Sequence, residues 1–114
     1  MKTSSLRNDL TYNEDKVSIH VMMETDVSKE IRILLKKGQE MKAHKAGFPI
    51  TIEIHSGAIN FGVNDDEMNL VTGDLIYLDA NVPHSLLAKE DSIVRLTLST
   101  FDSADRVKEV AKQS

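Results

Sequence analysis

The sequence contains no cysteine, and this absence excludes several kinds of chemistry at once. Without a thiol there is no disulfide, no thiolate nucleophile and no thiolate metal site. A clustered basic face of the kind that binds nucleic acid is also missing, because 14 basic and 18 acidic residues are mixed along the chain and the formal net charge is −4. No apolar run is long enough to cross a membrane, and none near the start has the form of an export signal. We therefore expect a cytoplasmic protein with neither a nucleic-acid nor a membrane partner.

What is present is the composition of an ordinary globular domain. The chain has 114 residues, of which 40% are hydrophobic and 28% charged, and this is enough for one core. Alternating apolar and polar residues, divided by frequent turns, predict about nine short strands and almost no helix, which is typical of an all-β sandwich or barrel. The expected divisions are a polar N-terminal arm over residues 1–15, a barrel over residues 16–102 and a short C-terminal helix over residues 103–114.

Individual strands and the helix have local signals. Ile50–His55 is the clearest strand, because three isoleucines alternate with polar residues. The residue types of Glu30–Lys37 suit a helix as well as a strand, and the glycine that follows favours the strand. Ser103 is the expected N-cap of the helix, with Asp105 in its first turn.

Two stretches each bring one histidine to the end of a strand. Gly38–Gly57 carries His44, and Gly73–His84 passes through a tight polar corner before it reaches His84. Strand alternation places Lys42 and His44 on one face, so we expect the lysine to lie beside that histidine.

These two stretches resemble the two sequence motifs of the cupin superfamily. The first cupin motif is a glycine, five residues, His-x-His, a glutamate, and a closing glycine after six further residues. Gly38 and His44 match it with the right gap, and Gly57 matches the closing glycine. The second motif begins with a glycine that precedes a histidine by a fixed gap, and Gly73 and His84 match both the residues and the gap.

Several motif positions differ from the cupin pattern. Ala46 stands at the second histidine position of the first motif, and Ile50 stands at the glutamate position. In the second motif, Asp79, Asn81 and Ala88 stand for a proline, a glycine and an asparagine. The Asn81 change is mild, because asparagine tolerates the left-handed conformation that a glycine would take.

The resemblance covers roughly residues 30–98 and implies a double-stranded β-helix, the cupin or jelly-roll barrel. A typical cupin metal centre has three histidines and one glutamate. Here His44 and His84 would remain as ligands of one divalent metal (Fe, Mn, Zn, Ni or Cu), with Asp79 as a candidate third. Two imidazoles alone make a poor site, since catalytic zinc normally has three protein ligands. The alternatives are that the two histidines bind a small polar or anionic ligand, with Lys42 adding charge, or that they bond only to each other or to water.

Two functional classes follow from this resemblance. The loss of two of the four metal ligands favours a small-molecule binding or regulatory module that is not an enzyme. The alternative is a metal-dependent cupin enzyme of the dioxygenase or isomerase type, and histidine itself can act as acid or base near neutral pH. We also expect a homodimer, because small cupins usually pair and because Val17–Glu24 would otherwise be an exposed edge strand. His20 and His55 are expected on solvent-facing or partner-facing sides of their strands.

Overall fold

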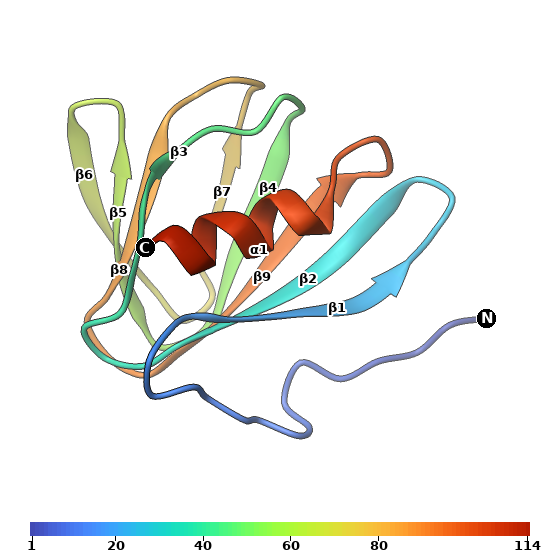
Figure 1. The fold of residues 1–114 in the computed structure, drawn as a ribbon, viewed down its shortest axis with the longest axis horizontal. Coiled ribbons are helices and arrows are strands. Elements are labelled where there is room, and N and C mark those ends of the chain that lie inside the picture. The colour runs from blue at the N-terminus through green and yellow to red at the C-terminus, as the bar shows by residue number, and fades with distance from the viewer.

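The computed structural model describes residues 1–114 as two β-sheets that face each other, with one helix between their edges (Figure 1). One sheet has five strands in the order β1-β2-β9-β4-β7, and the other has four in the order β3-β8-β5-β6. All neighbouring strands are antiparallel. The elements are β1 (Ser18–Glu24), β2 (Ser28–Leu35), β3 (Glu40–His44), β4 (Ile50–Ser56), β5 (Ala58–Val63), β6 (Asp66–Val71), β7 (Leu75–Leu78), β8 (His84–Ala88), β9 (Ser92–Ser99) and α1 (Ala104–Gln113). The predicted all-β double-stranded β-helix with one short helix is confirmed, and the ambiguous stretch after residue 30 is a strand.

The core lies between the two sheets, and β4 shows how the sequence places it there. Ile50, Ile52 and Ile54 are buried on the inner face, while the intervening Glu53 and His55 are only partly covered on the outer face. Their cross-strand partners on β9 are buried as well. Fully burying an isoleucine contributes about 1.5–3 kcal/mol, so this alternation fixes which face of the strand points inward.

Two corners need a backbone conformation that most residues avoid. Gly57 has φ +114, and a Cβ atom there would lie 2.8 Å from the backbone of Asp91 and of Ser92. The β4–β5 corner can therefore approach the β8–β9 turn only with glycine. Asn81, at the corner before His84, has φ 66, which confirms that asparagine takes the left-handed conformation at the position where the cupin motif has glycine.

Helix α1 lies across the opening between the two edge strands β1 and β3 (Figure 1). The Ser103 hydroxyl accepts hydrogen bonds from the backbone N–H groups of Asp105 and Arg106, so Ser103 is the N-cap that the sequence predicted. Val107 and Ala111, one turn apart, are the buried residues of the helix. α1 has neither the length nor the hydropathy to span a membrane.

The N-terminal arm, residues 1–15, contains no helix or strand and lies over its own five-stranded sheet. Its anchor is Arg32 on β2, which is only 4% exposed. The Arg32 guanidinium donates to the backbone carbonyls of Leu6, Asn8 and Asp9 at 3.4, 2.7 and 3.3 Å. Peptide oxygens, and no carboxylate, therefore hold this buried cation.

Candidate functional site

His44 ends β3 and His84 begins β8, and the two residues are direct cross-strand partners. We call them the histidine pair. Their ring centroids lie 4.3 Å apart. Nδ1 of His44 lies 2.7 Å from the carbonyl oxygen of Lys42, and Nδ1 of His84 lies 2.9 Å from that of Val82. Because a carbonyl oxygen can only accept, each Nδ1 carries the proton and each Nε2 presents a lone pair.

A β-bulge in β3 decides which residues share the inner face with His44. Met41 pairs with Leu86 and His44 pairs with His84, so β3 has one more residue than β8 between these two pairs. The extra residue restores His44 to the face of the buried Met41 and puts Lys42, which is exposed, out of alternation with it. The expectation that Lys42 and His44 share a face is therefore wrong, and it is the Lys42 carbonyl that contacts the histidine ring.

The histidine pair borders a small, largely apolar cavity between the sheets and α1. Its lining residues are Ile33, Met41, His44, Ile50, Ile52, His84, Leu86, Leu96, Arg106 and Val107. Its volume is ≈ 10 Å³, which is about the space that one water molecule needs. The barrel mouth is thus closed in this structure.

Arg106 is a site residue that the sequence reasoning missed. It reaches the cavity from α1, and its Nε and Nη2 donate to the two carboxylate oxygens of Asp102 at 2.9 and 2.8 Å. Asp102 is only 6% exposed, and this burial acts to raise the pKa of its carboxyl group. Hydrogen bonds from Arg106 and from the Ser103 N–H, together with the Arg106 charge, outweigh burial, so the pKa is lowered. The loop before α1 and the helix therefore carry a paired ion to the edge of the cavity.

Both members of the histidine pair are uncharged at neutral pH. Burial lowers the pKa of His84 to about 4; the hydrogen bond to the Val82 carbonyl opposes this, and the charges of His44 and Arg106 add to it. Burial also lowers the pKa of His44, again with Arg106 acting in the same direction. The site therefore presents two neutral acceptor nitrogens beside a guanidinium.

The other two histidines lie outside this cavity, on the outer face of the five-stranded sheet. Nδ1 of His20 lies 3.4 Å from Nη2 of Arg32, and Nδ1 of His55 lies 3.6 Å from a carboxylate oxygen of Glu53. Neither side chain borders the cavity of the histidine pair.

Comparison with known proteins gives a likeness in structure only. No family model matches the sequence, and no curated protein matches it. An RmlC-like cupin protein of Desulfovibrio desulfuricans superposes with a TM-score of 0.80 at 20% identity, over 88% of this chain and 97% of that one. The chain has the cupin fold.

Two further cupin-like structures agree with this assignment. A conserved protein of Klebsiella pneumoniae with a double-stranded β-helix domain gives a TM-score of 0.79 at 17% identity, covering 90% of this chain and 88% of that one. KdgF from a Halomonas species gives 0.70 at 19% identity, covering 76% and 82%. At these identities the likeness establishes the fold alone.

The residues at the cupin metal position do not fit a resident metal ion. Ala46 and Ile50, which stand at two of the cupin ligand positions, are buried core residues at 3% exposure each. Asp79 is exposed in the β7–β8 loop, and no three histidine, aspartate or glutamate side chains gather where they could hold a metal. Arg106, the other polar side chain of the cavity, has only N–H donors and cannot be a metal ligand, and its carboxylate partner Asp102 is held in their ion pair.

Proposed function

We propose that this protein is a binding module, without catalysis, for a small hydroxycarboxylate-type ligand at the mouth of its cupin barrel. The observation that carries the proposal is the matched arrangement of the histidine pair. Each Nδ1 is bonded to a backbone carbonyl, so two neutral Nε2 acceptors border one cavity. Such a pair suits a ligand with a hydrogen-bond donor, such as a hydroxyl group.

Arg106 is the residue that would bind the carboxylate group of the ligand. Two of its five N–H donors are used by Asp102, which leaves three for a ligand. A guanidinium pairs well with a carboxylate. The remaining walls, such as Ile33 and Leu96, are aliphatic and suit a short alkyl segment. A short hydroxycarboxylic acid combines a donor, a carboxylate and a small apolar part.

A metal-dependent enzyme of the dioxygenase or isomerase type is the second candidate, and one observation favours it. Histidines that bind metals usually donate their other ring N–H to a carbonyl or carboxylate, as both members of the histidine pair do. Two observations count against a metal-dependent enzyme: the site has only two possible metal ligands, and a guanidinium lies beside them. We therefore rank it below the binding module.

Nuclear magnetic resonance (NMR) of protein containing isotope-labelled histidine tests both candidates. The chain has 4 histidines, so His20 and His55 are internal controls that lie away from the cavity. The probes are lactate, propionate (which lacks the hydroxyl), 1-propanol (which lacks the carboxylate) and zinc chloride. We expect lactate to shift the ring signals of the histidine pair and leave the two controls unchanged, with much weaker effects from propionate and 1-propanol.

The variant His84→Asn should remove the lactate response, while His55→Asn should keep it. Equal responses at all four rings, or equal responses to lactate and propionate, would contradict the ligand class. A response of the histidine pair to one equivalent of zinc, with none to the organic probes, would replace the binding module with the metal-dependent candidate.

A further inference from the structure

Every wall of the cavity beside the histidine pair belongs to a β-sheet, except the wall formed by α1. Strands supply eight of the 10 lining side chains, and α1 supplies the other two, Arg106 and Val107. We propose that α1 is a lid, and that a ligand reaches the histidine pair only when α1 undocks from the barrel. This regulation rests on the proposed function, because it concerns the same cavity, which at ≈ 10 Å³ is too small for an organic ligand while α1 is docked.

The helix is attached to the barrel by fewer interactions than the strands are to one another. Val107 and Ala111 are its two buried side chains, and Ala104 and Val110 pack against the core while partly exposed. No backbone hydrogen bond joins α1 to a strand. The polar link between them is the bond from the Lys42 N–H to the Ser114 hydroxyl, at 2.9 Å. Neighbouring strands, in contrast, are joined by ladders of backbone hydrogen bonds, so α1 is the wall that can separate without unfolding the sheets.

A pivot for this movement lies where the chain leaves β9. The Asp102 carbonyl accepts a hydrogen bond from the Lys29 ammonium, which holds the start of the α1 segment on β2. Arg106 is bonded to the Asp102 side chain, four residues earlier, so this ion pair stays intact when the rest of the helix swings away. Undocking therefore exposes apolar surface but leaves no buried charge without its partner.

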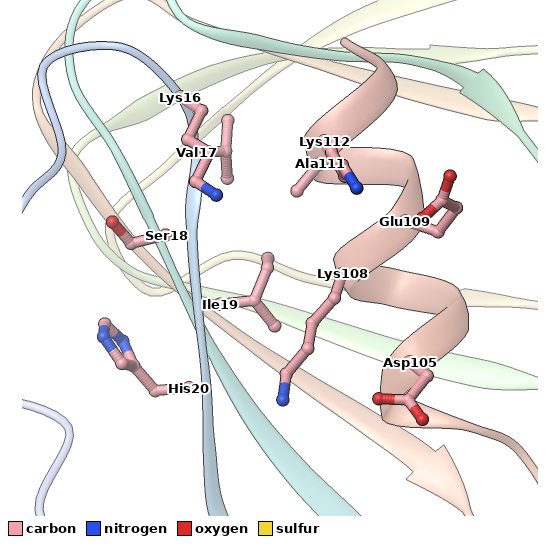
Figure 2. Close-up of a pocket in the computed structure, with 10 residues that line it drawn as sticks. All are labelled: Lys16, Val17, Ser18, Ile19, His20, Asp105, Lys108, Glu109, Ala111 and Lys112. Carbon is pink, nitrogen blue, oxygen red and sulfur yellow. The ribbon is translucent and has the colours of Figure 1, made fainter.

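The flank of α1 that faces β1 borders a groove. This groove, of ≈ 510 Å³, lies where the helix meets β1, and residues of α1, of β1 and of the segment just before β1 line it. Figure 2 shows Val17, just before β1, and Ile19 of β1 pointing toward the helix, with Lys108 extending from α1 along the groove. The helix packs on the core through Val107 and Ala111, and Asp105, Lys108 and Lys112 border the groove, so this flank holds charged side chains with room to move.

The absence of cysteine makes a direct test of the lid possible with single introduced thiols. Ile52 and Ile54 lie two residues apart on the inner face of β4 and are 2% and 0% exposed, but only Ile52 borders the cavity. We would label Ile52→Cys and Ile54→Cys with dithiobis-nitrobenzoate under native conditions and measure the urea unfolding of each variant. We expect Ile52→Cys to react at least about tenfold faster than its global unfolding allows, and Ile54→Cys to react only through global unfolding.

A second pair of variants identifies α1 as the element that opens. Val107→Asp, made in the Ile52→Cys protein, should raise the labelling rate at least about tenfold, because aspartate weakens only the docked state. Lys108→Asp, on the exposed face of the same helix, should leave the rate within about threefold.

Labelling of Ile52→Cys and Ile54→Cys at the rates set by global unfolding would overturn the lid, and so would equal effects of Val107→Asp and Lys108→Asp. If Val107→Asp does not fold, the comparison of Ile52→Cys with Ile54→Cys still decides the question. No ligand is used in this assay. A lid without any lactate response would refute the proposed function alone, and a lactate response without opening would refute the lid alone.

Discussion

Acid should destabilise this protein through His84, which is 4% exposed and must be neutral in the folded chain. Its pKa falls from 6.5 to about 4 on folding, mainly because of burial. Between these two values the unfolded chain binds a proton that the folded chain does not, so stability rises with pH across this window. The contribution is complete above pH 6.5 and lost as pH falls to about 4. At about 1.4 kcal/mol per pH unit, it amounts to about 3 kcal/mol.

Other groups change with pH in ways that can be separated from His84. Burial lowers the pKa of His44 and of His20, so both add to the same trend. Hydrogen bonds and charges from Arg95 lower the pKa of Glu53, but that carboxyl loses its contribution mainly below its ordinary pKa of 4.5. The window between pH 4.5 and pH 6.5 is therefore dominated by histidine.

The assay is urea unfolding as a function of pH for the parent, His84→Asn and His55→Asn, the last as a control that removes one histidine outside the cavity. We expect the pH dependence of the unfolding free energy to be shallower in His84→Asn than in either of the other proteins, by up to about 1.4 kcal/mol per pH unit. If His84→Asn and the parent have the same pH dependence, the histidine pair is solvated in solution and the reasoning about the site is refuted.

Four further predictions concern the rest of the chain. Gly57→Ala should lower the unfolding free energy by at least about 2 kcal/mol, because its Cβ would overlap with the backbone of Ser92, and a change below about 0.5 kcal/mol would contradict this. Arg32→Met should free the N-terminal arm and speed protease cleavage within residues 1–15, whereas unchanged cleavage would mean that the arm is not held by Arg32. Ser103→Ala should raise the labelling rate of a cysteine at position 52 about fivefold, since loss of an N-cap costs about 1 kcal/mol. An unchanged rate would mean that the N-cap does not help to keep α1 docked. Light scattering should give a mass of twice 12.7 kDa for the homodimer that the edge strand β1 suggests, and the monomer mass would exclude it.

The fold was predictable from the sequence because its signals are local and redundant. The isoleucines at 50, 52 and 54 select the inner face of β4 without knowledge of any partner strand. Gly38 marks the turn before β3, Gly73 marks the turn before β7, and Ser103 marks the start of α1. Each signal depends on a few neighbouring residues, so each can be recognised in one sequence without knowledge of the structure.

The site was predictable only in part, because its decisive features depend on contacts between distant segments. The register of β3 against β8 creates the bulge that separates Lys42 from His44, and no residue type within β3 announces it. Arg106 stands next to Val107 on the helix, but the sequence does not say that this part of α1 covers the barrel mouth. The histidine gaps pointed to a shared location, and the structure places His44 and His84 side by side.

The proposed binding site stands or falls with the protonation of each ring nitrogen of His44 and His84 at neutral pH, which long-range nitrogen–proton NMR measures. We expect that in both rings Nδ1 carries the proton and Nε2 is bare, because the Lys42 and Val82 carbonyls can only accept. A proton on Nε2 of either ring, or a charged imidazolium, would contradict the proposed binding site, because the cavity would then lack the two acceptor nitrogens on which the proposed function depends.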